Sequence, residues 1–198
     1  AFSIASKSKN NAILINPHLK NAKIAIRKAK KGGMSSTEWN EALRHAQTAH
    51  MLSPSSDTPK LLLAEIAIGQ GYTDKAREWF RQVLDNDDEN MKAIDGMARI
   101  AGLENRPEEV ETWLKKAFSM KPDDASTSHN LGYFYLQQRE LEQADTYLRM
   151  SLQKNPESLE TQLAISELYL LREEYARARI TIDRIHQTKK IGMSWFLR

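Results

Sequence analysis

Similar residues return along this chain every 34 positions. Proline forms one such series, with an aspartate in one slot: Pro54, Asp88, Pro122 and Pro156. Small residues form a second series with the same spacing: Ala42, Ala76, Val110, Ala144 and Ala178. Repetition at this step is typical of arrays of helical repeats, in which every unit buries its apolar face against its neighbours. It predicts a chain that grows by stacking units rather than by enlarging one core.

The composition agrees with a helical array and excludes other classes of protein. Of the 198 residues, 40% are hydrophobic and 28% are charged. No apolar run approaches the roughly 18 residues of a membrane-spanning helix. The chain has no cysteine, so it has neither disulfides nor thiolate chemistry. A chain without cysteine is compatible with a reducing or an oxidising compartment, so the sequence allows a cytoplasmic or a periplasmic location.

Positive charge is concentrated at the N-terminal end. The first 33 residues carry eight Lys and Arg and no Asp or Glu, whereas the whole chain has a net charge of only +3. Residues 1–17 lack helical periodicity and end at Pro17, so we predict an extended arm there. A transit-peptide remnant is an alternative, although arginine is missing. Because the sequence starts at Ala1, we expect a processed chain or a piece of a longer protein, with a removed signal peptide or an upstream domain both possible.

Residues 18–31 are predicted to form an amphipathic helix. Its apolar face holds Leu19, Ala22, Ile26 and Ala29. The rest of its surface is a basic patch: Lys20, Lys23, Arg27, Lys28, Lys30 and Lys31. One interpretation makes this the first helix of a capping unit, residues 18–56, whose outer face must be polar. The other has the basic patch contact an anionic membrane or an acidic partner.

The second helix of this capping unit has its own start signal. Ser35 to Glu38 has the pattern of a capping box, in which the two side chains satisfy backbone N–H groups at a helix start. We expect the helix to reach about Leu52. Its inward positions are small: Ala42, Ala46 and Ala49.

Four units in register follow: residues 57–90, 91–124, 125–158 and 159–192. The third has the clearest pattern: Leu131, Gly132, Tyr135, Ala144, Leu148, Ser151 and Pro156. Small residues such as Gly132 bring the two helices of a unit together, and bulky ones such as Phe80 and Tyr135 fill the space between units. Proline cannot continue a helix, so it marks where each second helix ends.

This pattern resembles the tetratricopeptide repeat over roughly residues 35–190. The resemblance implies an all-α fold, a right-handed α-solenoid of stacked helix-turn-helix units: about four full repeats after a half-degenerate N-terminal unit. In this family, partners bind mainly in a concave groove lined by the first helix of each unit. The corresponding positions here are Leu61, Glu65, Lys92, Asp95, Arg99, Ser126, His129, Tyr133, Gln137, Leu163, Glu167 and Leu170. Such a groove should take an extended or helical segment that has both apolar and charged groups.

The chain ends in an apolar stretch, residues 193–198. Exposure of the apolar side chains of Trp195, Phe196 and Leu197 to water would be unfavourable. Three interpretations stay open: they start a further helix that docks on the last unit, the chain was cut inside such a helix, or they contact a partner.

No catalytic or cofactor pattern accompanies the repeats. The five histidines lack metal-ligand spacing, and the sequence has no glycine-rich phosphate loop, nucleophile elbow or HExxH motif. We therefore expect no enzyme, no metal and no cofactor.

The favoured function is a scaffold or adaptor that binds another protein, with assembly of a bacterial envelope, pilus or secretion complex suggested only by analogy. In the alternatives, the basic patch anchors the chain to an acidic surface with the repeats as a spacer, or the array self-associates through its ends. Specific nucleic-acid recognition is not expected, because residues 18–31 have no interleaved aromatics.

Overall fold

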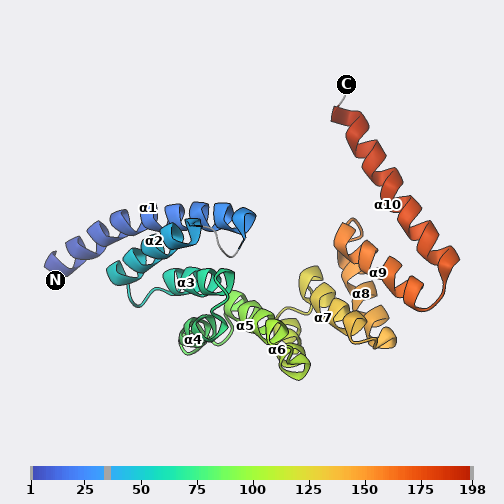
Figure 1. Ribbon diagram of the computed structural model, residues 1–198, viewed down its shortest axis with the longest axis horizontal. Coiled ribbons are helices and arrows are strands. Elements are labelled where there is room, and N and C mark those ends of the chain that lie inside the picture. The colour runs from blue at the N-terminus through green and yellow to red at the C-terminus, as the bar shows by residue number, and fades with distance from the viewer. Residues whose placement is uncertain (1, 34–36, 197–198) are drawn as a thin grey trace. The chain divides into compact units, whose positions relative to one another are not determined.

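The computed structural model describes the backbone of residues 2–33 and 37–196, and the side chains of residues 14–33 and 37–186. This part of the chain is all-α, with ten helices and no strand (Figure 1). The helices are α1 (Phe2–Gly32), α2 (Glu38–Leu52), α3 (Asp57–Gly69), α4 (Thr73–Leu84), α5 (Met91–Leu103), α6 (Pro107–Met120), α7 (Ala125–Gln137), α8 (Leu141–Lys154), α9 (Leu159–Leu171) and α10 (Tyr175–Phe196). The predicted class, an α-solenoid of helix-turn-helix units, is confirmed.

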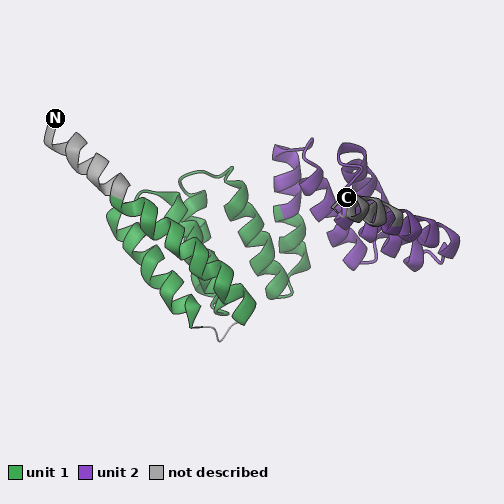
Figure 2. Cartoon of the chain, turned by 90° about the horizontal axis from the view of Figure 1, so that it is seen from above, with its two compact units in different colours: residues 1–113 green, residues 114–198 purple. Residues whose placement is uncertain are grey.

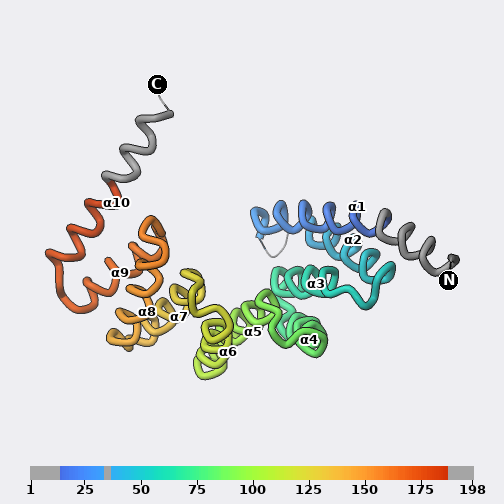
Figure 3. Tube along the Cα trace, turned by 180° about the vertical axis from the view of Figure 1, so that it is seen from behind, coloured from blue at the N-terminus to red at the C-terminus, as the bar shows by residue number. Residues whose placement is uncertain are grey.

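The chain divides into two compact units, residues 1–113 and 114–198 (Figure 2). In the first unit, α1 and α2 lie side by side and antiparallel, and α3 packs on both α2 and α4 (Figure 3). In the second unit, α7 pairs with α8, and α9 packs against α8 and α10. Each 34-residue step therefore holds one pair of helices.

The turn inside each full pair has one geometry. A residue with positive φ follows the first helix at the same position in each repeat: Gly71 (82°), Asn105 (55°), Arg139 (63°) and Glu173 (60°). The N–H of the next residue then donates to a carbonyl five residues back, as from Tyr72 to Ala67 at 2.8 Å. Together these features form the Schellman motif, which satisfies the last carbonyls of the first helix. The motif turns the chain back, so that the second helix lies against the first.

Small residues let the helices approach closely. In the first unit, Ala42, Ala46 and Ala49 are fully buried, as predicted from the sequence. In the second unit, a Cβ added to Gly132 would lie 2.8 Å from the backbone nitrogen of Leu148, so only glycine permits this separation of α7 and α8. Close approach at such positions buries the apolar faces on which the array depends.

The N-terminal helix differs from its prediction. Helix α1 begins at Phe2 and runs through Pro17, so the extended arm predicted for residues 1–17 is wrong for the backbone from Phe2 onward. Proline fixes φ at a helical value and costs the helix one hydrogen bond, which a long helix can tolerate. The alanine, lysine and leucine residues before Pro17 are good helix formers.

Two other expectations concern the start of α2 and the C-terminal end. Ser35 of the predicted capping box lies outside the described residues, and Thr37, which precedes α2, makes no side-chain capping bond. At the other end, the backbone of residues 193–196 continues α10, so the further helix considered there does not start as a separate element. The side chains of that segment lie outside the described residues.

A nearly buried ion pair links successive repeats in the first unit. Arg77 of α4 is 8% exposed, and its guanidinium donates to Glu109 at 2.6 Å and to Glu104 at 2.5 Å. The hydrogen bond from Arg77 is the largest cause that lowers the pKa of Glu109 below its ordinary value. Two repeats further along, the same two positions hold the opposite charges. There Asp145 forms an ion pair with Arg172, with its Oδ2 3.4 Å from Nη1.

The left-handed turn residue generates the first prediction. Replacing Arg139 with Gly should stabilise the protein by about 0.5–1 kcal/mol, because glycine adopts positive φ without the steric cost that arginine has there. The Arg139 side chain is exposed, so no packing is lost. The urea midpoint, followed by circular dichroism, should rise, whereas Gly71→Ala at the equivalent turn should lower it. A lower midpoint for Arg139→Gly would contradict the assignment.

The ion pair generates the second prediction. Arg77→Gln should destabilise the protein by about 1–2 kcal/mol at neutral pH, because two partly buried carboxylates lose their buried charged donor and keep only the more exposed Arg106. Since the folded pKa of Glu109 is lowered, its contribution is complete above the ordinary carboxyl pKa and is lost as the pH falls through the folded pKa. The difference in urea midpoint from wild type should therefore shrink below about pH 4.3, the ordinary glutamate value.

The matched control is Arg179→Gln. Arg179 is 86% exposed and only loosely paired with Asp183, at 3.9 Å. This change should be close to neutral at every pH. Equal losses in the two variants, or a difference for Arg77→Gln that stays constant down to pH 3, would show that the Arg77 pair contributes nothing beyond a surface contact.

Candidate partner-binding site

First helices of three successive pairs surround one cavity in the first unit. This α1–α5 cavity has a volume of about 470 Å³. Its lining residues come mainly from α1, α3 and α5: Lys23, Arg27, Thr58, Leu61, Leu62, Glu65, Ile68, Phe80, Lys92, Asp95, Gly96 and Arg99. Five residues that the sequence placed in the groove are therefore brought together here: Leu61, Glu65, Lys92, Asp95 and Arg99.

The floor of the α1–α5 cavity is apolar, and a glycine shapes it. The Phe80 ring of α4 is 5% exposed and lies directly over Gly96 of α5. A Cβ on Gly96 would lie 2.2 Å from the ring, so glycine is required for the ring to occupy this place. Leu62 and Ile68 are also buried and extend the floor along α3. The floor can therefore receive an apolar side chain of a bound segment.

The walls of this cavity carry more positive than negative charge. Four of the lining side chains are basic, two from α1 (Lys23 and Arg27) and two from α5 (Lys92 and Arg99), whereas Glu65 and Asp95 are acidic. Glu65 also accepts from Lys30 of α1, with 2.5 Å between Oε1 and Nζ. The cavity is therefore a mixed surface with a basic excess.

The basic patch predicted on α1 is divided between two environments. Lys23 and Arg27 line the α1–α5 cavity, and Lys30 reaches Glu65. Lys20, Lys28 and Lys31 are exposed and line none of the cavities described here. The sequence suggested two separate surfaces, a groove and a basic face, but in this unit they share side chains. Sequence reasoning missed this because it excluded the capping helix from the groove, although α1 has the place of a first helix.

In the second unit, the predicted groove residues lie on α7 and α9. Ser126 and His129 line a small polar pocket of about 130 Å³, together with Glu160 and neighbouring polar side chains. Tyr133 stacks on His129, with ring centroids 6.0 Å apart and planes 10° from parallel. The other members do not line this pocket: Gln137 is exposed, Glu167 is half-buried, and Leu163 and Leu170 are 48% and 46% exposed.

A network of hydroxyl groups selects the tautomer of His129, that is, which ring nitrogen carries the proton. Ser151 donates its only hydroxyl proton to the Ala125 carbonyl at 2.8 Å, so it must accept from Thr161 at 3.1 Å. Thr161 then has no further proton, and it accepts from Ser158 at 2.9 Å and from His129 Nδ1 at 3.1 Å. His129 therefore carries its proton on Nδ1, which leaves Nε2 as a hydrogen-bond acceptor. Burial lowers the pKa of His129, against the opposing effect of Glu160, and so favours the neutral ring.

The described residues contain no group of three or more His, Cys, Asp or Glu side chains that could hold a metal ion. Among the helices of the described part, none combines the length and the apolar character that crossing a membrane requires.

Comparison with known proteins agrees with the fold. The family model for the tetratricopeptide repeat matches residues 60–90 and 125–157. None of the curated protein sequences matches this chain.

Three solved structures illustrate the structural similarity. The structure of pilF from Pseudomonas aeruginosa has 23% identity and a TM-score of 0.67, with 86% of this chain and 78% of that chain covered. MamA (41–end) from Desulfovibrio magneticus RS-1 has 15% identity and a TM-score of 0.66, covering 86% and 96%. TTC0263, a thermophilic TPR protein of Thermus thermophilus, has 16% identity and a TM-score of 0.67, covering 86% and 90%. At these identities the similarity shows the fold alone.

The contact between Phe80 and Gly96 generates a prediction. Gly96→Ala should destabilise the first unit by about 1–3 kcal/mol, because the added Cβ overlaps the Phe80 ring. In a Phe80→Leu background, the same change should cost markedly less, since leucine leaves room for the methyl group. Urea titrations of the four proteins in this double-mutant cycle measure the coupling. Additive losses would mean that Phe80 does not rest on Gly96 in solution.

Proposed function

Because this chain is a tetratricopeptide-repeat protein, we propose that it is a non-enzymatic scaffold that holds a segment of another protein against its first helices. The observation that carries the proposal is the α1–α5 cavity, where five groove positions from α3 and α5 meet Lys23 and Arg27 of α1. An apolar floor beside charged walls suits an extended or helical segment that presents both kinds of side chain. Proteins with this repeat generally act as binding scaffolds.

The exposed side chains of α7 and α9 provide a second place for such a segment. Leu163, Glu167 and Leu170 follow the i, i+4, i+7 spacing of one helix face, and Tyr133 adds an exposed aromatic ring on α7. Exposed leucine and tyrosine on the positions used for recognition favour contact with a partner, since such apolar surface gains by burial. Within this function we favour the assembly of a multiprotein complex, such as an envelope, pilus or secretion apparatus.

Site-specific photocrosslinking tests the location of binding. The photoreactive residue p-benzoylphenylalanine, placed at Leu61 in the cavity, should crosslink one partner protein in cells of the source organism. The control position is Met51 on α2, which is 80% exposed and does not line the cavity. Mass spectrometry would identify the captured protein and its crosslinked peptide. The same products from both positions, or none from Leu61, would place binding elsewhere.

A double variant gives the corresponding prediction. Replacing Arg99 and Tyr133 together with alanine should reduce capture of the crosslinked partner at least tenfold. Both side chains are exposed, so the melting temperature should change little. The matched control replaces Arg179 and Tyr175 of α10, an exposed arginine and an exposed tyrosine outside the groove positions. Undiminished capture by the Arg99 and Tyr133 variant would remove the groove from the proposal.

The alternative function is attachment to an acidic surface through α1. It is favoured by Lys20, Lys28 and Lys31, which are exposed and do not line the α1–α5 cavity. Such attachment should weaken steeply with salt. Replacing these three lysines with glutamate should abolish binding to phosphatidylserine vesicles and leave the Leu61 crosslink intact. Vesicle binding that is absent in the wild type, or unaffected by salt, would end this alternative.

A further inference from the structure

Aromatic side chains normally fill the space between successive second helices of this chain. They stand at one position of the repeat, which holds Trp79, Trp113 and Tyr147 in turn. Trp79 of α4 meets the His50 ring of α2 edge-on, with centroids 5.2 Å apart. Tyr147 of α8 meets Phe118 of α6 in the same way at 5.3 Å. The second helices thus pack through rings at this position.

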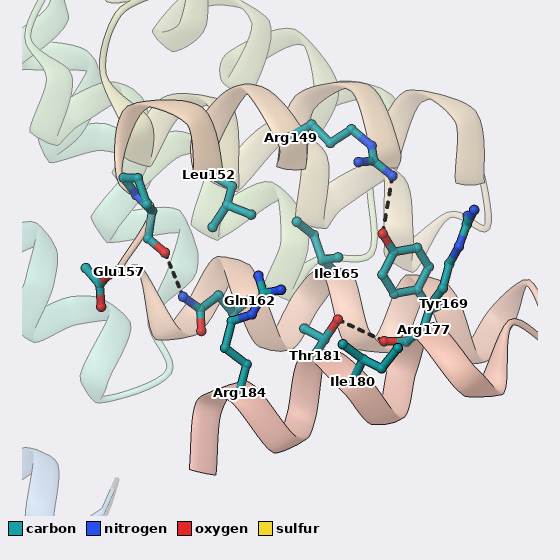
Figure 4. Close-up of a pocket in the computed structure, with 11 residues that line it drawn as sticks. Arg149, Leu152, Glu157, Gln162, Ile165, Tyr169, Arg177, Ile180, Thr181 and Arg184 are labelled. Atoms are coloured by element: carbon teal, nitrogen blue, oxygen red, sulfur yellow. Dashed lines mark hydrogen bonds between the residues drawn. The ribbon is translucent and has the colours of Figure 1, made fainter. Parts of the chain in front are cut away.

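The last repeat breaks this series. Its residue at the aromatic position is Thr181 of α10, whose hydroxyl donates to the Arg177 carbonyl at 2.9 Å. Beside Thr181 lies a crevice of about 480 Å³ between α8, α9 and α10 (Figure 4). We call it the α8–α10 crevice. It exists because threonine leaves empty the volume that a tyrosine or tryptophan fills in the preceding repeats.

The crevice also contains a tyrosine without the stacking partner found one repeat earlier. In the third repeat, Tyr135 stacks on Tyr147, with ring centroids 5.6 Å apart and planes 18° from parallel. Tyr169 stands at the Tyr135 position of the next repeat, but threonine replaces the second ring. Instead, the Tyr169 hydroxyl accepts from Arg149 at 3.3 Å, and the guanidinium carbon of Arg177 lies 5.9 Å from the ring centroid.

The rim of the crevice is basic. Arg149, Arg177 and Arg184 line it, and Glu157 is the acidic residue of the lining. Two of these arginines are oriented by carboxylates that do not themselves line the crevice. Arg149 donates through Nε to Asp145 at 2.7 Å, and Arg177 donates through Nη1 to Glu174 at 2.6 Å. A guanidinium has five N–H donors in a fixed fork, so each retains donors for a carboxylate.

We propose that the α8–α10 crevice binds an aromatic side chain with a neighbouring carboxylate, both supplied by a segment of a partner protein. The ring takes the place vacated at Thr181 and lies against Tyr169, as Tyr147 lies against Tyr135. The carboxylate meets the arginines of the rim, whose charge it complements. None of the groove residues lines this crevice, so the inference is independent of the function proposed for the first helices.

Helix α10 continues to Phe196, so the backbone of Trp195 lies on the same helix as Thr181 and about 21 Å further along its axis.

Calorimetry with short synthetic peptides tests the proposal. The probe is the capped peptide Asp-Glu-Trp-Glu-Asp, and its control has alanine in place of tryptophan. The wild-type protein should bind the tryptophan peptide at least tenfold more tightly than the control. Raising the salt concentration should weaken binding of the tryptophan peptide. Equal binding of both peptides, or no binding at millimolar concentration, would overturn the proposal.

A variant that restores the missing ring locates the site. Thr181→Tyr should fill the crevice, keep or raise the melting temperature, and abolish peptide binding. The matched control is Thr146→Tyr on α8, an exposed threonine that makes the same bond to the carbonyl four residues earlier. That control should bind normally. Undiminished binding by Thr181→Tyr would place the peptide elsewhere and overturn the proposal.

Two further measurements complete the test. If Thr181→Tyr does not fold, the paired change Arg177→Gln and Arg184→Gln, at two exposed positions, replaces it. This pair should lower affinity at least tenfold, and unchanged affinity would overturn the proposal. Sedimentation of the wild type distinguishes a different occupant: a concentration-dependent dimer that Thr181→Tyr abolishes would assign the crevice to a second copy and overturn binding of a different protein.

Discussion

The close approach of two helix backbones at small side chains is the contact on which this structure depends. Short isolated helices are marginally stable in water, so burial against neighbouring helices provides most of the stability of the array. Gly132 against Leu148, and the buried alanines of α2, show how the separation is kept short. The Schellman turns position the second helix for this contact. Residues on the outer surfaces contribute little to the stability of the array, so they are available for binding.

The repeat step made most of the fold predictable. Small residues at fixed intervals implied helix pairs, and Ala42, Ala46 and Ala49 are buried as that implied. The start of α1 was predicted wrongly, because Pro17 was taken as a stop signal, whereas the structure continues the helix through it. The left-handed turn was foreseeable at Gly71 but not at Arg139 or Glu173. Those residues adopt positive φ because the packed helix pair requires it, despite their own preference.

The candidate binding surfaces were predictable only in part. Positions on α3 and α5 follow from the resemblance, and they meet at one cavity. The share of α1 in that cavity was missed, because a capping helix was treated as a separate surface. The α8–α10 crevice was also missed, although the sequence carried its signal: Thr181 interrupts a series of aromatic residues. The tautomer of His129 depends on Ser151, Ser158 and Thr161 meeting around it. Such contacts between side chains distant in sequence require the structure.

The reversed ion pairs have a consequence for the order of the repeats. The second helix of one repeat offers Arg77 to Glu104 of the next, whereas the equivalent contact two repeats later joins Asp145 to Arg172. If the helix carrying Asp145 were placed before the turn carrying Glu104, two carboxylates would face each other in a partly buried interface. The repeats are therefore not interchangeable modules, despite their common backbone. An array with these two junctions exchanged would lose both ion pairs and bring like charges together, so charge helps to fix the order of these repeats.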